Sequence, residues 1–436
     1  MNISYTKHRL DNGLDVLVHE DHDCPIVAVN VWYHVGSKNE TPGRTGFAHL
    51  FEHLMFEGSE HHDRGYFHPL QEAGASLNGS TNADRTNYWE VVPTNALELA
   101  LWMESDRMGY LLPALTSAKF ENQREVVLNE RRQNYENRPY GLANMAIVAA
   151  LYEPHHPYHW LTIGAPEDIR AARLEDVRLF FQTYYTPRNA SLTLAGDIRT
   201  DDAVSLAAEY FGTLEGGEEP PAVAPPPMPP IAREIRLVLE DRVELPRLYL
   251  AWHSPALFAN DDAALDLVAD VLSSGKTSRL YRSLVYDRRI ATEVAASQNS
   301  REIGSFFQIV ATAAPGRTLA ELELAIAGEL EGLIGHGPTA VEMERCVAQA
   351  EVHFVSRLQT VGGFGGKSDQ LNAYNVFVGN PGYFDEDLAR YRALTSSDLR
   401  AATAKWLCPA ERVVLSVVPR GKLTLALPDS QPVTVS

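Results

Sequence analysis

Two histidines four positions apart, with a glutamate directly before the second, stand in the segment His49–His53. On an α-helix with about 100° per residue, the His53 side chain lies about 40° from that of His49, and Glu52 lies about 60° to the other side. All three side chains therefore converge on one spot. Two neutral imidazoles suit a borderline-soft divalent ion such as zinc, and a third protein ligand leaves one position open for water. Glu52 can then reach that water as a general base without binding the metal.

The residues around these three side chains predict a buried helix. The flanking apolar residues are Phe47, Ala48, Leu50, Phe51, Leu54 and Met55. A helix that is apolar nearly all round is buried on most sides, and polar side chains inside it need partners, which a metal ion supplies. The alternative is a helix that carries two surface histidines and a glutamate by chance, because so short a pattern also arises accidentally. The apolar context favours the metal, and Gly58 is a candidate helix stop.

The order His-x-x-Glu-His is the reverse of the common zincin motif. With it, the chain resembles the M16 family of zinc peptidases, which includes pitrilysin, insulysin and mitochondrial processing peptidase, and it is most similar to the short bacterial M16B type. The resemblance extends from Leu10-Asp-Asn-Gly-Leu14 to the last strand near Val413. The family's third zinc ligand is a glutamate roughly 75 residues beyond the motif, in a second helix. The segment 120–132 matches that helix, and Glu130 stands at the expected separation from His53.

The resemblance therefore implies a metalloendopeptidase, an inverzincin that binds one zinc ion per chain. Its metal ligands would be His49, His53 and Glu130, and its general base Glu52. Many members of the family carry a further glutamate seven positions before the ligand glutamate, which supports the ligands without binding the metal. In this chain that position holds Gln123. An amide can hold a hydrogen bond but cannot ionise, so the charge tuning by that carboxylate is absent.

Composition limits the other classes of function. The 436 residues are 45% apolar and 22% charged, which predicts a soluble protein of two or three domains. The net charge of −19 argues against nucleic acid and favours basic peptides, although solubility alone explains such a charge. No apolar run is long enough for a membrane span, and the first nine residues do not read as a signal peptide. A cytoplasmic protein and a periplasmic protein whose signal was removed both stay open. Cys24, Cys346 and Cys408 are expected to be free thiols.

An internal repeat divides the chain. Asp176 and Pro187 recur at one common offset as Asp398 and Pro409, and Pro25 before one strand recurs as Pro246 at an offset shorter by one position. Strand pairs followed by runs of helices favour an α+β architecture, and the resemblance implies two homologous α/β-roll domains of the LuxS/MPP-like metallohydrolase fold. The predicted division is an N-terminal zinc-binding catalytic domain (1–214), a proline-rich linker (215–231) and a C-terminal homologous domain without a zinc site (232–436).

Only the first copy carries the metal-binding residues. The offset between Pro25 and Pro246 moves the three motif positions onto Asp270, Ser273 and Ser274. The offset between Asp176 and Asp398 moves them onto Val271, Ser274 and Gly275. Neither set is a zinc site.

The segment 75–82 resembles the family's edge strand, which pairs with extended substrate. On that resemblance we expect Leu77, Asn78, Gly79 and Ser80 to bind peptide. An unpaired strand edge binds an extended peptide through main-chain hydrogen bonds, so unfolded peptides are the expected substrates. The alternative is a polar turn before the strand over 86–92.

The second copy lacks a pair of residues that the family uses at the substrate. C-terminal copies in the family carry Leu-Arg-x-x-x-x-x-x-Tyr, and the matching positions here are Val285 and Thr292, with Arg282 and Tyr286 out of register. Neither Val285 nor Thr292 can donate the strong hydrogen bonds that hold an oxyanion. Some M16B enzymes divide the work between a zinc-binding subunit and a metal-free partner that supplies the Arg–Tyr pair. The resemblance therefore implies the catalytic subunit of a heterodimer that encloses peptides in a chamber. A self-sufficient homodimeric peptidase and a non-catalytic structural or assembly subunit are the alternatives.

Three further motifs are rejected. His155, His156 and His159 stand between prolines that prevent a helix, so a structural loop is expected there and not a second metal site. The segment His19–His22 is one residue short of the zincin spacing. Gly362–Ser368 resembles a phosphate-binding loop, but its first glycine position holds Val361 and a helical segment precedes it, so nucleotide binding is not expected. A glycine loop near the substrate cavity stays open for this segment.

Overall fold

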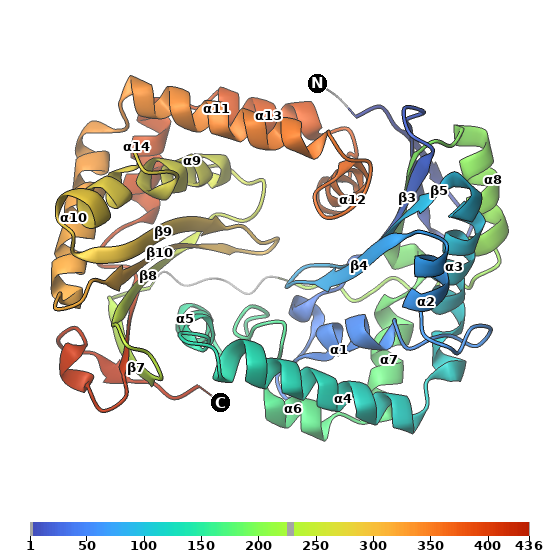
Figure 1. The fold of residues 1–436 in the computed structure, drawn as a ribbon, viewed down its shortest axis with the longest axis horizontal. Coiled ribbons are helices and arrows are strands. Elements are labelled where there is room, and N and C mark those ends of the chain that lie inside the picture. The colour runs from blue at the N-terminus through green and yellow to red at the C-terminus, as the bar shows by residue number, and fades with distance from the viewer. Residues whose placement is uncertain (1–2, 225–230, 436) are drawn as a thin grey trace. The chain divides into compact units, whose positions relative to one another are not determined.

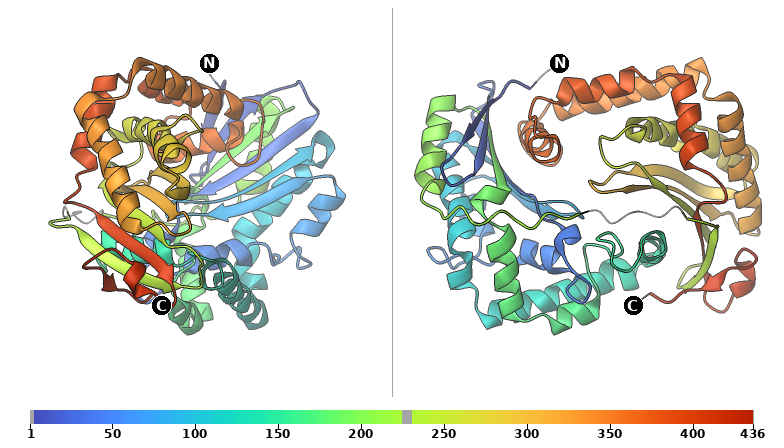
Figure 2. Two further views of the ribbon diagram at one scale, coloured as in Figure 1. Left: turned by 60° about the vertical axis from the view of Figure 1, so that its left-hand side comes forward. Right: turned by 180° about the vertical axis from the view of Figure 1, so that it is seen from behind.

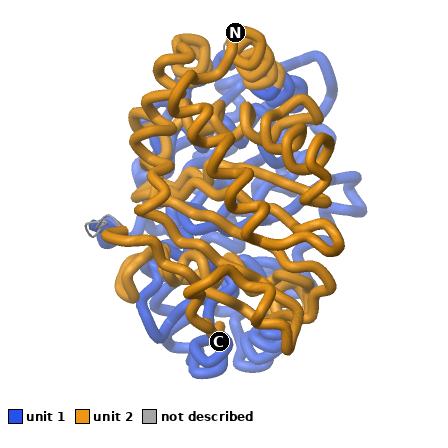
Figure 3. Tube along the Cα trace, turned by 90° about the vertical axis from the view of Figure 1, so that its left-hand side faces the viewer, with its two compact units in different colours: residues 1–129, 161–224, 353–386 blue, residues 130–160, 225–352, 387–436 orange. Residues whose placement is uncertain are grey.

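The computed structural model describes residues 3–224 and 231–435 of the chain. It forms two compact units, which Figure 3 shows in different colours. The first unit contains residues 1–129, 161–224 and 353–386, and the second contains residues 130–160, 225–352 and 387–436. Part of the predicted proline-rich linker, residues 225–230, lies outside the described residues.

The first unit is built on a six-stranded sheet in the order β1-β2-β6-β3-β5-β4. Its strands are β1 (Thr6–Arg9), β2 (Asp15–Glu20), β3 (Ile26–Tyr33), β4 (Ser76–Thr81), β5 (Thr86–Pro93) and β6 (Ala190–Gly196). β2 and β6 are parallel, and the other neighbours are antiparallel. β4 therefore lies at an edge, with β5 as its one partner among the described strands. An edge strand leaves half of its main-chain hydrogen-bonding groups unpaired within the sheet.

Helices cover both faces of this sheet. Those of the first unit are α1 (Phe47–Leu54), α2 (Phe67–Glu72), α3 (Leu97–Ala114), α4 (Ser117–Arg131, its last two residues in the second unit), α6 (Pro166–Ala171), α7 (Leu174–Tyr184), α8 (Thr200–Phe211) and α12 (Lys367–Val378). α3 and α8 pack on one face and α12 packs on the other, against β2, β3 and β6 (Figure 1). Burial on both sides explains why every residue of β3 after Ile26 is buried.

The contact between α12 and the sheet is polar. The side chain of Asn372 accepts a hydrogen bond from Thr193 Oγ1 at 2.8 Å and donates one to the carbonyl of Asn30 at 2.9 Å. Asp369 accepts a hydrogen bond from Trp32 Nε1 at 2.8 Å. This helix therefore supplies hydrogen-bond partners to buried polar groups in the middle of apolar strands.

The second unit has a six-stranded sheet in the order β12-β7-β11-β8-β10-β9, in which the five strands from β7 to β9 repeat the order of β2 to β4 in the first sheet. The sixth strand differs, because β12 pairs with β7 in parallel whereas β1 pairs with β2 antiparallel. Its strands are β7 (Ile235–Asp241), β8 (Arg247–Ser254), β9 (Ala291–Asn299), β10 (Ser305–Ala313), β11 (Val413–Pro419) and β12 (Gln431–Pro432). Its helices are α5 (Ala143–Leu151), α9 (Asp262–Ser273), α10 (Leu319–His336), α11 (Ala340–Arg357, shared with the first unit), α13 (Phe384–Arg392, also shared) and α14 (Ser396–Trp406). Figure 2 shows both sheets and their helices from two further sides.

The predicted repeat and the α+β class are confirmed by this topology. β3, which follows Pro25, and β8, which follows Pro246, occupy the same place in their sheets. The compact units nevertheless differ from the two sequence halves. Residues 130–160 group with the second sheet because α5 packs on β8 and β11, and residues 353–386 group with the first because α12 packs there. Thus α5, from the first half of the sequence, packs on the second sheet, and α12, from the second half, packs on the first sheet.

Candidate metal centre

Helix α1 carries the motif, and its first turn is capped by a residue that the sequence analysis missed. The buried carboxylate of Glu40 accepts hydrogen bonds from the main-chain N–H groups of Gly46 at 2.9 Å and Ala48 at 2.8 Å. These are among the N–H groups that have no partner inside the helix, and a negative charge at this end is favourable. Gly46 adopts φ +87°, and a Cβ atom there would lie 2.5 Å from Ile169 Cδ1. The helix already ends at Leu54, so the predicted stop at Gly58 was wrong.

The two motif histidines and Glu130 come together. One ligand atom from each of His49, His53 and Glu130 lies within 4.8 Å of the others, and all three residues are half-buried. The two imidazole rings are 4.9 Å apart and perpendicular. Two imidazole nitrogens and one carboxylate oxygen at this spacing are the donor set of three-ligand zinc sites. Among the residues that the structure describes, this is the one group of three or more His, Cys, Asp or Glu side chains with such a spacing.

Glu130 lies in the last turn of α4. Thr116 Oγ1 accepts a hydrogen bond from the main-chain N–H of Lys119 at 3.3 Å, which is an N-terminal cap. Asn134, in the π-helical turn that follows (Arg132–Glu136), donates a hydrogen bond to Glu130 Oε1 at 3.3 Å. The amide of Gln123 donates to the carboxylate of Glu57, shortly after the end of α1. Gln123 therefore ties α4 to the end of the motif helix.

Glu52 lies in the same helix, near the hairpin that joins β4 to β5. Burial lowers the pKa of Arg85 in that hairpin, and the negative charges of Asp369, Glu52 and Asp84 oppose this shift. Arg85 Nη1 in turn donates a hydrogen bond to the main-chain carbonyl of Ser80 at 2.8 Å. Arg85 therefore contacts the end of β4 and lies within the electrostatic influence of Glu52.

The four residues expected to bind peptide lie on β4, which is the edge strand of the sheet, so the alternative of a polar turn is excluded for them. β4 packs against α1. A Cβ atom at Gly79 would lie 2.9 Å from the ring of Tyr88 and 3.0 Å from that of Phe56, which follows the motif helix. Gly79 thus lets the edge strand approach the end of α1 closely.

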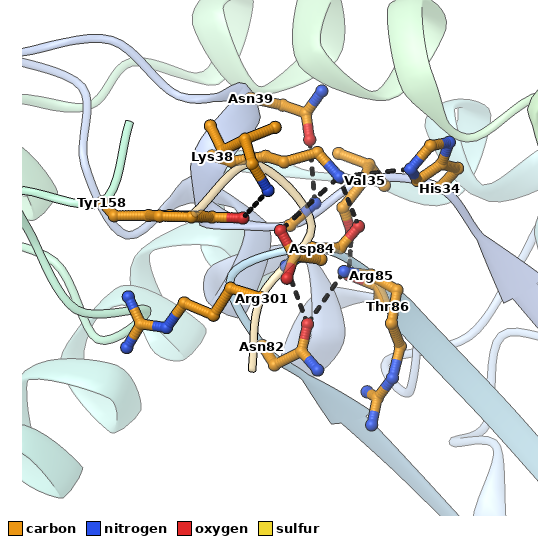
Figure 4. Close-up of polar contacts among 12 residues, drawn as sticks. His34, Val35, Lys38, Asn39, Asn82, Asp84, Arg85, Thr86, Tyr158 and Arg301 are labelled. Atoms are coloured by element: carbon orange, nitrogen blue, oxygen red, sulfur yellow. Dashed lines mark hydrogen bonds and ion pairs between the residues drawn. The ribbon is translucent and has the colours of Figure 1, made fainter. Parts of the chain in front are cut away.

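A buried lysine positions the hairpin turn at the end of β4 (Figure 4). Lys38 Nζ donates to the carbonyl oxygen of Asp84 at 3.0 Å and lies 3.7 Å from its carboxylate. Asn82 Oδ1 accepts hydrogen bonds from the main-chain N–H groups of Asp84 and Arg85, at 2.7 and 2.9 Å. These contacts hold the turn, and with it Arg85, in one conformation.

The second unit has a helix at the place of α1 but no metal ligands at the shifted motif positions. α9 ends at Ser273, and in either register those positions fall in its last turn or just after it, on aspartate, valine, serine and glycine. The family's Arg and Tyr positions hold Val285, in a π-helical turn (Tyr281–Asp287), and Thr292, whose hydroxyl donates to the carbonyl of Thr312 at 3.4 Å. The side chain of Val285 packs against the apolar core of this unit.

The histidines over 155–159 form a turn, as expected. His156 is buried, and its Nδ1 accepts a hydrogen bond from the main-chain N–H of Tyr158 at 3.0 Å. Burial lowers the pKa of His156 to about 4, with the nearby His253, Arg301 and His159 adding to the shift. This imidazole is therefore neutral at pH 7 and has a structural role.

Comparisons with known proteins agree with the fold. A family model described as "Insulinase (Peptidase family M16)" matches residues 15–158, and one described as "Peptidase M16 inactive domain" matches residues 171–350. The chain is 31% identical over 355 residues to "Zinc protease PqqE" of Helicobacter pylori, which is 80% of this chain and 79% of that protein. It is 24% identical to "Probable mitochondrial-processing peptidase subunit beta" of Arabidopsis thaliana, over 61% of this chain and 50% of that protein. The crystal structure of a protease from Helicobacter pylori superposes with a TM-score of 0.88 at 26% identity, over 96% of this chain and all of that one.

The described residues form two similar α+β units, and a His-x-x-Glu-His helix lies in the first of them with Glu130 close to its two histidines. The chain belongs to the M16 family of peptidases. Its relatives are named zinc proteases, and the donor set at α1 and α4 fits zinc. None of the described helices is long and apolar enough to span a bilayer.

Proposed function

We propose that this chain is the catalytic subunit of a zinc-dependent endopeptidase that cleaves extended or unfolded peptides. The observation that carries the proposal is the mutual approach of His49, His53 and Glu130, with Glu52 on the same helix as the two histidines. These three residues would hold one zinc ion per chain. Bound there, zinc would polarise the scissile carbonyl group and lower the pKa of a water molecule.

Glu52 is the general base in this proposal. It takes the proton from the attacking water and passes it to the leaving amine. Because Glu52 precedes His53 directly, the motif helix presents it beside the metal ligands without making it one of them. Gln123 has a positioning role, since its amide hydrogen bond to Glu57 ties α4, which carries Glu130, to the end of α1.

The substrate segment would add a strand to β4. Main-chain groups of Leu77, Asn78, Gly79 and Ser80 would pair with the peptide backbone, which favours segments without stable structure. A compact folded domain cannot offer such a strand, so it should resist cleavage.

A second chain of the same family is the proposed partner. Val285 and Thr292 cannot supply the donors that the family's Arg–Tyr pair offers to the substrate. One relative is named a subunit beta, and its name supports the idea of paired subunits for this chain. We therefore propose a heterodimer that closes around peptides, with this chain holding zinc. A self-sufficient homodimer is the second candidate, and a non-catalytic assembly subunit the third.

Metal binding and hydrolysis test the proposal together. The purified chain should bind about one zinc ion per molecule, as in three-ligand sites, and His49→Ala or Glu130→Ala should reduce the zinc content strongly. Glu125→Ala, at an exposed position of α4, is the matched variant, and it should keep the metal. The chain alone should cleave unstructured peptides weakly and gain chelator-sensitive activity when it is mixed with a homologue that carries Leu-Arg-x-x-x-x-x-x-Tyr. No bound zinc and no chelator-sensitive hydrolysis, alone or in the mixture, would overturn the proposal.

A further inference from the structure

A cavity of about 620 Å³ lies in the first unit, apart from the metal ligands. It is lined by the chain after β2, by strands β3, β4 and β5, and by the loop before α12. Its lining includes the side chains of Ile26, Ser76, Trp89, Val91, Leu358 and Val361. Neither the metal ligands nor Glu52 contribute to its walls.

The glycine loop Gly362–Gly366 forms one wall, and the sheet holds it in place. A Cβ atom at Gly362 would lie 2.5 Å from Val91 Cγ2 and 2.7 Å from Ala28 Cβ, so the loop touches the sheet through its main chain. Gly365 N–H donates to Asp369 Oδ2 at 2.8 Å, and the other carboxylate oxygen of Asp369 accepts from Trp32. The loop is therefore tied to the sheet from both sides, and the cavity is a built feature of the unit.

The chemistry of the walls favours an apolar guest. Ile26, Trp89, Val91, Leu358 and Val361 give the cavity apolar walls, and the glycines of the loop add no side chains to fill the space. The two charges nearest each other, Asp21 and Lys367, form an ion pair at 2.6 Å and so neutralise each other. Asp23 is exposed to solvent, where its charge is screened. Concave sites with an apolar floor and a polar rim bind apolar groups and fix them by a few polar contacts.

The cavity lies at the start of β4. Ser76, the first residue of β4, lines the cavity, whereas Ser80, whose carbonyl oxygen accepts a hydrogen bond from Arg85, does not. Four residues of an extended strand span about 13 Å. A peptide that adds to β4 therefore passes both places, and its side chains at the two places are about four residues apart.

We propose that this cavity binds a large apolar side chain, such as Phe, Leu or Met, of the extended peptide that pairs with β4. The contact lies about four residues along the peptide from the residue opposite Ser80. This inference rests on the proposed function, because it assumes a peptide on the edge strand. It adds a specificity site that selects one position of the substrate, whereas pairing along β4 reads only the main chain.

The thiol of Cys24 allows the cavity to be filled by chemical modification. It lines the cavity and is exposed, Cys346 is buried and Cys408 is half-buried. A thiosulfonate reagent can add a benzylthio group to Cys24 and fill the cavity, and a reagent that adds a methylthio group is the matched control. The variant Cys24→Ser excludes effects of the other two cysteines.

The first measurement profiles the cleavage products of a random peptide library. We expect large apolar residues to be enriched at one fixed position relative to the cleaved bond, by about tenfold over alanine. The benzylthio group should abolish this enrichment, and the methylthio group and Cys24→Ser should leave it. A preference for basic or small residues at that position, or an apolar preference that the benzylthio group leaves unchanged, would overturn the proposal.

The second measurement does not need hydrolysis. The rate at which bromobimane alkylates Cys24 is followed in the metal-free chain, with pools of random peptides that contain or lack large apolar residues. The apolar pool should slow the alkylation and the other pool should not. Equal rates with both pools would overturn the cavity as a binding site. Protection in a chain that never hydrolyses peptides would leave the cavity standing and refute the peptidase function instead.

Discussion

Replacing Glu40 by alanine should loosen the motif helix. Glu40 accepts two hydrogen bonds from the main chain at the start of α1, from Gly46 and Ala48. Each buried N–H group that loses its partner costs about 1–3 kcal/mol, so two should cost about 2–6 kcal/mol. Since about 1.4 kcal/mol is a factor of ten, the amides of α1 should lose at least about 30-fold of their protection from hydrogen exchange.

The assay is hydrogen–deuterium exchange with the metal removed, because bound zinc would stabilise the folded state by mass action. Peptides that cover α1 are compared between the wild type, Glu40→Ala and Glu40→Gln. Glutamine keeps one acceptor oxygen and should lose about half of the effect in free energy. Glu125→Ala on the exposed side of α4 is the matched control and should change nothing in α1. Unchanged protection of α1 in Glu40→Ala would refute the capping role of Glu40.

Three further predictions follow from single contacts. Gly79→Ala should weaken the binding of extended peptides and destabilise the first unit by about 1–3 kcal/mol, since its Cβ would press on Tyr88 and Phe56. Denaturant titration measures the stability and a binding assay measures the peptide affinity. An unchanged affinity would contradict the close approach of β4 to the end of α1. The folded-state pKa of His156, about 4, lies below the unfolded value near 6.5, so its contribution to stability is present above pH 6.5 and is lost as the pH falls toward 4. His156→Gln should flatten this part of the profile of unfolding free energy against pH. A profile identical to that of the wild type would refute the lowered pKa of His156. Val285→Arg with Thr292→Tyr should raise the peptidase activity of the chain on its own, and full activity of the wild-type chain that this double variant leaves unchanged would refute the division of labour between two subunits.

Local patterns predicted the parts of the molecule that depend on local periodicity. The spacing of His49, Glu52 and His53 placed them on one helix, and all three lie on α1. The internal repeat predicted two similar sheets, and five strands of each have the same order. Glu130, in contrast, was found through the family resemblance, because no local pattern states which two helices approach each other.

Contacts between distant segments could not be predicted in this way. Glu40 caps α1 from outside the helix, at a distance along the chain that no capping motif describes. The packing of α12 on the first sheet joins the N-terminal strand β3 to a helix near the other end of the chain. A signal for that packing was present in Asn30 and Thr193, polar residues inside apolar strands, because a buried polar group needs a partner. The sequence does not say which segment supplies it.

The central claim is that Glu52 is the base beside a zinc ion held by His49, His53 and Glu130. The measurement that tests it most directly compares zinc content and hydrolysis of an unstructured peptide in the wild type and in Glu52→Gln, each assayed with the same partner chain. We expect Glu52→Gln to keep about one zinc ion per chain and to lose hydrolysis by at least about a hundredfold, because its ligands are intact and its base is not. Undiminished hydrolysis in Glu52→Gln, or a wild-type chain that binds no zinc, would contradict the claim.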